Sequence, residues 1–343
     1  MKFGIFDHLD RRDEPLGKFY NDRLEMAAAY EAAGFYSYHI AEHHATPLGL
    51  APSPNIFLAA VARRTNRLRF GPLVYLLPMY HPVRLAEEIC MLDHMSGGRL
   101  DVGVGRGISP HEVGFYGVAP DDRQEIFEES LELLLKGLTS SRLSHAGNWY
   151  RIPDTPIELR PLQNPHPPLW YGAGNEYGVE FAARRGMNMV TLGANQRVKG
   201  LVARFHELWD ETQDDPMRAG SPVETPLAGI SRHLFVADTD AEADRLARPA
   251  YAHWYDSVTK LWREHGDAPV TGMLIDSYDE ACRIGVAVCG SPATVLAKFA
   301  AQFEDIGFNY LVCQIAWGTL THAQEMNSLS LFRNEIMPSL AGP

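Results

Sequence analysis

Two neighbouring histidines and an acid, Glu42-His43-His44, follow an apolar stretch at residues 35–40 that is typical of a buried strand. Imidazole titrates near neutral pH, so these side chains could transfer protons or hydrogen-bond to a substrate. A metal site is the alternative, because histidines and acids are common ligands, but the H-x-H and H-x-x-x-H spacings are missing. We therefore expect acid–base chemistry without a metal, with at least one of the two histidines bracing the loop.

Two glycine-rich stretches could bind an anion. In Gly103-Val104-Gly105-Arg106-Gly107, the guanidinium of Arg106 could hold a phosphate in a bidentate manner, although a solvated arginine at a tight corner explains the same residues. The second stretch precedes a predicted helix, whose free N–H groups and dipole favour an anion. A loop that merely begins a helix would have the same sequence. Its residues are Gly174, Asn175, Glu176, Tyr177 and Gly178.

These residues must be positioned by a fold in which strands and helices alternate. One strand–helix–strand unit is plain at residues 67–107. It has an apolar strand at 68–77, a helix that begins near Pro82 and stops at Gly97-Gly98, and a second strand at 99–104. The same pattern gives eight strand candidates, at residues 2–6, 35–40, 68–77, 99–104, 169–172, 187–192, 230–237 and 308–314.

A TIM-type (β/α)8 barrel and a doubly wound open sheet both fit this alternation. No G-x-G-x-x-G pattern follows the first strand, and polar residues follow several strands, so we favour the α/β barrel, built by residues 1–343 as one domain. Gly147-Asn148 predicts a hairpin insertion near 142–160, and weak periodicity predicts an insertion or lid near 266–290. Aromatic residues between 251 and 262 recur at helical spacing; packing is our interpretation, and a substrate-pocket wall is the alternative.

Composition excludes several classes of protein. The net charge of −12, from 31 basic and 43 acidic residues, argues against a nucleic-acid-binding protein. The longest apolar run, 73–80, contains Pro78 and is too short to cross a membrane, and the first residues do not resemble a signal peptide. The four cysteines lack C-x-x-C spacing. We expect a cytoplasmic protein with a small-molecule substrate.

Several stretches together resemble the bacterial luciferase-like family of flavin-dependent monooxygenases. They are MKFGIF, AEHHATPLG, RLRFGPLVYLLPMYHPVRLAEEICMLDHMSGGRLDVGVGRG, FYGV and GSPATVLAKFAAQFEDIGFNYLVC, which run nearly from end to end. The resemblance implies a TIM-like barrel that forms a homodimer. It implies reduced FMN (FMNH2), supplied by a separate NAD(P)H:flavin reductase. Dioxygen would add to the flavin C4a atom, and the resulting hydroperoxide would oxygenate a small, apolar organic substrate.

The resemblance also assigns roles to residues. Phe6 and the Leu73-Val74 segment would flank the isoalloxazine ring, with a cis peptide bond between Leu73 and Val74. Arg106 and residues 174–178 would bind the phosphate. Luciferase carries a reactive cysteine before this arginine, where this chain has Gly105, so its pocket chemistry is expected to differ.

His43 matches the catalytic histidine of the family, and we group Glu42 and His44 with it as candidate catalytic residues. Two alternative functions remain. One is an F420-dependent oxidoreductase of the same superfamily, which transfers a hydride without oxygen, and the other is a flavin-binding protein without catalytic activity.

Overall fold

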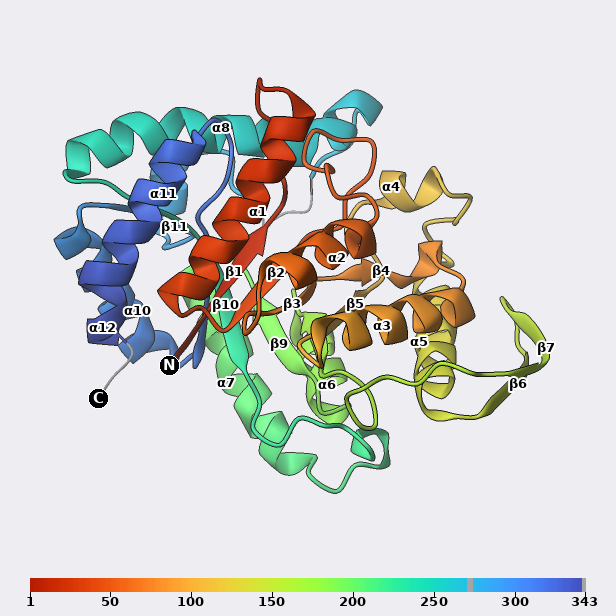
Figure 1. Cartoon of the computed structure of the whole chain (residues 1–343). Helices are drawn as coiled ribbons and strands as arrows, with labels where there is room; N and C mark the ends of the chain where they lie inside the picture. The colour runs from red at the N-terminus through yellow and green to blue at the C-terminus, as the bar shows by residue number, and fades with distance from the viewer. Residues whose placement is uncertain (270–273, 341–343) are drawn as a thin grey trace.

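Parallel strands surrounded by helices form a nearly closed barrel (Figure 1). The structure is a computed structural model that describes residues 1–269 and 274–340. The barrel sheet runs in the order β3-β2-β1-β12-β10-β9-β8-β5-β4, and β11 pairs with β10, which confirms the predicted α/β barrel. Its strands are β1 (Lys2–Asp7), β2 (Ser37–Ile40), β3 (Arg69–Pro72), β4 (Tyr75–Leu76), β5 (Val102–Gly105), β8 (Leu169–Gly172), β9 (Asn188–Thr191), β10 (Ala228–Val236), β11 (Ala287–Gly290) and β12 (Tyr310–Gln314).

The two strands at the ends of the sheet order, β3 and β4, lie in one continuous stretch of the chain. Strand β3 pairs with β2, β4 pairs with β5, and Phe70 forms a parallel bridge with Leu100 just before β5. The prediction of one continuous strand at 68–77 is therefore wrong, because the chain changes its pairing partner at Leu73-Val74. The peptide bond between these two residues is cis, as the family resemblance implied.

Helices cover the outside of the barrel, and two of them end where glycine predicts. Gly34 ends α1 and Gly97 ends α3, with φ angles of 90° and 68°, which glycine adopts without steric cost. Pro82 opens α3 as predicted. The long helices are α1 (Leu16–Ala33), α2 (Pro54–Arg64), α3 (Pro82–Ser96), α5 (Arg123–Thr139), α6 (Glu176–Arg184), α7 (Asn195–Glu211), α8 (Asp240–His265), α10 (Pro292–Ile306) and α11 (His322–Leu331).

The two predicted insertions have different outcomes. Strands β6 (Arg142–Ala146) and β7 (Arg151–Pro156) form an antiparallel hairpin that projects from the barrel, as predicted (Figure 1). The prediction of an insertion throughout 266–290 is wrong for its second half. That half holds α9 (Tyr278–Arg283) and β11, and β11 belongs to the barrel sheet because it pairs in parallel with β10. Residues 270–273 of this stretch lie outside the described residues.

Large side chains fill the interior of the barrel. One buried cluster consists of Leu73, Trp170, Val190, Leu227, Tyr310 and Val312, and Phe6 and Val74 pack against it while remaining partly exposed. Strand side chains alternate between the two faces of the sheet, so the opposite residues of the same strands pack under the helices. The interior of the barrel is thus filled by bulky residues.

A group of buried charges joins the first strand to the helices outside it. The guanidinium of Arg23 on α1 donates to Glu325 Oε1 of α11 (2.9 Å) and lies 3.7 Å from Asp7 Oδ2 of β1. Arg12 donates to the same oxygen of Glu325 (2.8 Å). Removing one member would leave the others buried without compensation, which is costly.

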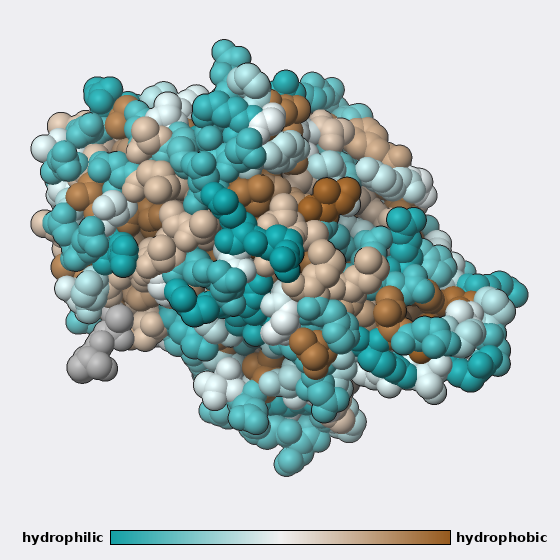
Figure 2. Space-filling view, in the orientation of Figure 1, coloured by the Kyte–Doolittle hydropathy of each residue, from teal (hydrophilic) through white to brown (hydrophobic). Residues whose placement is uncertain are grey.

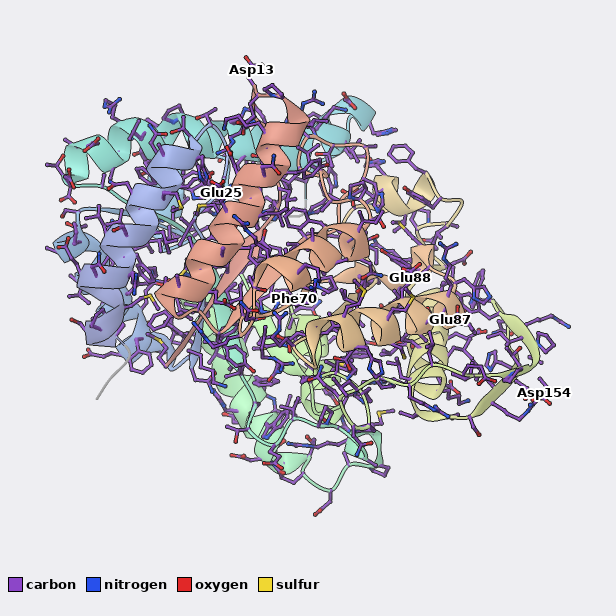
Figure 3. All side chains as sticks on the ribbon, in the orientation of Figure 1. Asp13, Glu25, Phe70, Glu87, Glu88 and Asp154 are labelled. Carbon is purple, nitrogen blue, oxygen red and sulfur yellow. The ribbon has the colours of Figure 1, made fainter. Side chains whose placement is uncertain are left out.

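The surface in view is mainly hydrophilic, with separate apolar areas (Figure 2). Glu87 and Glu88, labelled in Figure 3, lie on α3, and Glu88 accepts a hydrogen bond from Asn55 of α2 (2.8 Å). Within residues 1–269 and 274–340, no helix is long and apolar enough to cross a membrane.

Candidate functional site

The loop after β2 brings His43 against an acid from a distant part of the chain. His43 Nδ1 lies 3.0 Å from Oε1 of Glu112, a buried residue of the short helix α4 (Pro110–Gly114) that follows β5. A carboxylate accepts hydrogen bonds, so Nδ1 carries the hydrogen and Nε2 is the nitrogen left to gain or lose a proton. Sequence reasoning missed Glu112, because no local pattern joins two residues that are 69 positions apart.

Burial and neighbouring charges shift the pKa of His43 in opposite directions. Burial lowers its pKa, because it penalises the charged ring, but the Glu112 carboxylate raises the pKa by its charge and its hydrogen bond. The more distant charge of Glu42 adds to the increase, and the pKa of His43 ends above its ordinary value of 6.5. The imidazolium form of His43 therefore persists to higher pH than the imidazolium form of an isolated histidine.

The other two candidates of this loop bond to each other. Glu42 and His44 are buried, and His44 Nε2 lies 3.0 Å from Glu42 Oε1. The second carboxylate oxygen of Glu42 accepts the Leu76 N–H (3.0 Å), and His44 Nδ1 lies 2.8 Å from the hydroxyl of Tyr116. Protein groups thus occupy these polar atoms, which agrees with the expectation that one histidine braces the loop. We infer that Glu42 and His44 position His43 and do not themselves exchange protons with a substrate.

Aromatic rings extend from His43 across the mouth of the barrel. His8, at the end of β1, stacks on His43 with ring centroids 5.7 Å apart, and Trp254 of α8 lies 6.1 Å from His8. Trp254 and Tyr251 pack on the buried ring of His233, at 4.2 and 5.3 Å. Packing, the preferred interpretation of residues 251–262, is confirmed for these two aromatic residues. Sequence reasoning did not single out His233, which lies within an apolar strand.

The predicted flavin-facing residues come together. Phe6, Leu73 and Val74 belong to one cluster, although they are far apart in sequence. Gly105 lies against them, because a Cβ atom placed there would be 2.5 Å from Val74 Cγ2. Glycine at 105 leaves Val74 in its place, whereas a side chain there would displace this wall.

Two arginines lie at the predicted phosphate position. Arg106 follows β5 and is exposed, and Arg123 is the first residue of α5. Burial lowers the pKa of Arg123, and the positive charge of Arg106 lowers it further, so the two guanidinium groups lie near each other. Within the described part of the chain, Arg123 Nη1 is buried without a hydrogen-bond partner. An anion would supply the missing acceptor and the missing negative charge.

Sequence reasoning did not include Arg123. A signal for it exists, because the first turn of a helix is the end at which the helix dipole disfavours a positive charge. A partly buried arginine at that position therefore suggests an anionic partner.

Residues 174–178 start α6 as predicted. Asn175 caps the helix through Oδ1, which accepts the Gly178 N–H (2.9 Å), so that the N–H groups of Glu176 and Tyr177 are the ones that an anion could use. Burial and the hydrogen bond to Glu128 raise the pKa of Tyr177, while the charges of Arg185 and Arg106 oppose this. The loop therefore lies within electrostatic reach of Arg106.

The site offers no preformed metal-binding set. Among residues 1–269 and 274–340, the one group of at least three His, Cys, Asp or Glu side chains with ligand atoms within 4.8 Å of one another is Asp22, Glu25 and His322. That group lies beside α1 and α11, away from the mouth of the barrel, and exposed acidic groups of this kind are common without a metal.

A family model described as "Luciferase-like monooxygenase" matches residues 1–310. Among similar sequences, the uncharacterized protein y4wF of Sinorhizobium fredii is 37% identical over 337 residues, covering 98% of this chain and 96% of that protein. The oxygenase component of the flavin-dependent trigonelline monooxygenase of Acinetobacter baylyi is 28% identical over 359 residues, covering 99% and 96%.

A solved structure has the same fold. It is the oxygenating constituent of 3,6-diketocamphane monooxygenase from Pseudomonas putida, a type II Baeyer-Villiger monooxygenase in complex with FMN. Its TM-score is 0.79 at 24% sequence identity, and the match covers 98% of each chain.

Proposed function

Since the chain belongs to the luciferase-like monooxygenase family, we propose that it is the oxygenase component of a two-component, FMN-dependent monooxygenase. A separate NAD(P)H:flavin reductase would supply reduced FMN, as the name of the trigonelline relative suggests. One oxygen atom of O2 would enter a small organic substrate, the other would leave as water, and reduced FMN would provide the two electrons. The observation that carries the proposal is the His43–Glu112 pair. The His43 ring stacks on His8, and His8 packs edge-on against Phe6.

The residues of the site fit FMN in charge and shape. The doubly charged phosphate suits the paired guanidinium groups of Arg106 and Arg123, one of which has a buried, unpartnered nitrogen among the described residues. A flat ring suits the wall of Phe6, Leu73 and Val74. When bound, reduced FMN supplies the electrons and the oxygen-activating ring that no amino-acid side chain provides.

The side chains of the site would then have different roles. His43 would give or take a proton at Nε2, the nitrogen that does not face Glu112. Phe6 and Val74 would keep water away from the reacting atoms, since both are apolar and partly exposed at the mouth. Glu42 and His44 would hold the loop through their bonds to Leu76 and Tyr116.

Hydride transfer with F420 is the alternative that the sequence left open. To separate the two, anaerobically reduced FMN is bound to the protein and mixed with oxygenated buffer, while oxidised-flavin absorbance is followed. We expect oxidised flavin to appear more slowly than from free reduced FMN, and His43→Ala to abolish the delay. A rate equal to that of free FMN, together with tight binding of F420, would support the alternative.

We also propose a homodimer of one-domain subunits. Ile56 on α2 and Met91 and Met95 on α3 are exposed by 76%, 54% and 45%, and α2 packs beside α3, so these apolar side chains lie on neighbouring helices. Sedimentation equilibrium would measure the mass in solution.

We place the enzyme in the cytoplasm, because the NAD(P)H that its reductase would use is held there. The four cysteines, Cys90, Cys282, Cys289 and Cys313, are free, which agrees with a reducing compartment.

A further inference from the structure

The segment after β5, residues 106–116, contacts both histidines of the loop after β2. Glu112 Oε1 lies 3.0 Å from His43 Nδ1, and the Tyr116 hydroxyl lies 2.8 Å from His44 Nδ1. The Tyr116 ring also packs edge-on against His44, with centroids 4.9 Å apart. Both imidazoles are therefore oriented by one piece of chain, and that piece begins at Arg106, a proposed phosphate ligand.

The segment is itself held in place. Ser109 caps α4 by accepting the Glu112 N–H (3.4 Å), and the Glu112 residue is 3% exposed. On the other side, His111 stacks on His265 of α8 at 4.1 Å with ring planes 6° apart, and its Nε2 lies 3.0 Å from Asp267. The Glu112 carboxylate therefore has a defined position and cannot follow His43 freely.

We propose, on the basis of the function proposed above, that Glu112 is a positioning residue for the reaction. Its carboxylate keeps the hydrogen of His43 on Nδ1 at every pH at which the enzyme works, so that Nε2 alone gains and loses the proton. It also lies 3.0 Å from the ring, where its negative charge favours the imidazolium form of His43. Glu112 touches neither flavin nor substrate in this proposal and acts only through His43.

The surroundings of His43 support this role. Three titratable groups face it: Glu112 from α4, Glu42 from its own loop, and His8 from β1, stacked at 5.7 Å. Burial lowers the pKa of His8 well below its ordinary value, and the charges of His43 and His233 lower it further, so His8 stays neutral. For His43, burial is the largest influence and lowers the pKa. Without the charge of Glu112, that influence would prevail.

The test uses Glu112→Gln, which keeps the size and the acceptor oxygen but removes the charge. Glu132→Gln is the matched control, because it makes the same substitution at an exposed glutamate of α5 that pairs with Lys136 and, in the described part of the chain, has no contact with the loop of His43. The imidazole nitrogens of His43 are followed by NMR during a pH titration of the flavin-free protein, with assignment by a His43→Asn variant. We expect the titration midpoint of His43 to fall in Glu112→Gln, because the raising charge is lost, and to be unchanged in Glu132→Gln.

The second measurement is the pH profile of flavin reoxidation by the FMN-loaded protein. Glu112→Gln should move the profile toward acid in step with the NMR midpoint, with FMN affinity unchanged. An unchanged midpoint in Glu112→Gln overturns the proposal, as does an equal loss of rate at every pH. The two proposals can fail separately, because an acid shift seen by NMR without any delay in flavin reoxidation would refute the monooxygenase and leave the Glu112–His43 coupling standing.

Discussion

Gly105→Ala tests directly whether the Val74 wall is the seat of the flavin. The added Cβ would lie 2.5 Å from Val74 Cγ2 and 3.4 Å from its Cβ, and atoms closer than about 3 Å must move apart. Valine has few χ1 choices, so Val74 as a whole would shift into the mouth, where the flavin ring is proposed to bind. In the free protein Val74 can move into the mouth of the barrel. The substitution therefore makes the free energy of FMN binding less favourable, because Val74 must move back when FMN binds.

Overpacking of this kind costs about 1–3 kcal/mol, so the Kd for FMN should rise about 5- to 150-fold. The assay is a titration of oxidised FMN by its fluorescence. Val74→Ala in the Gly105→Ala background should restore much of the affinity, because the smaller side chain removes the clash; a double-mutant cycle isolates this coupling. Gly17→Ala is the control, since a Cβ there meets nothing within 4 Å. If Gly105→Ala binds FMN as tightly as the parent, the flavin does not lie against Val74.

Four further substitutions test other parts of the site and fold. His43→Ala should slow product formation about 10²- to 10⁴-fold, the usual contribution of acid–base catalysis, while FMN affinity stays nearly constant; a normal rate would exclude a role for Nε2. Arg106→Ala and Arg123→Ala should each weaken FMN binding by about 1.5–3 kcal/mol, the worth of a charged hydrogen bond, and leave riboflavin binding unchanged; equal affinity of the parent for both flavins would contradict the phosphate site. Glu325→Gln should lower the free energy of unfolding by about 3 kcal/mol, the low end for a broken buried pair because Asp7 still faces Arg23. Arg84→Met, which breaks an exposed pair, is the control in the same denaturant titration and should change little.

Local signals predicted the elements of this fold well. Gly34 and Gly97 end helices because they adopt positive φ angles, Pro82 opens a helix because its missing N–H is not needed there, and Gly147-Asn148 marks the turn of a hairpin. Each signal depends on a residue and its immediate neighbours. The alternation of strands and helices then left few folds to choose from.

The sequence predictions failed where the pairing between strands of the sheet determines the structure. The stretch 68–77 is uniformly apolar, so nothing in it shows that β3 pairs with β2 and β4 with β5. Strand β11 was read as part of an insertion because it is short and follows a poorly patterned stretch, yet it completes a ladder with β10. Pairing depends on strands that are far apart in sequence, and periodicity within one strand does not report it.

The chain by itself determined which residues could do chemistry here: His43 and Arg106 stood out by their types and their places after strands, and the family resemblance predicted that Phe6 faces a flavin. The tertiary structure decided what these residues can do. It placed Glu112 against His43, Arg123 near Arg106, and Val74 against the bare backbone of Gly105. The reason is physical, because a pKa, a tautomer or a steric clash depends on atoms within a few ångströms. In a nearly closed barrel those atoms come from strands and loops that are far apart in sequence.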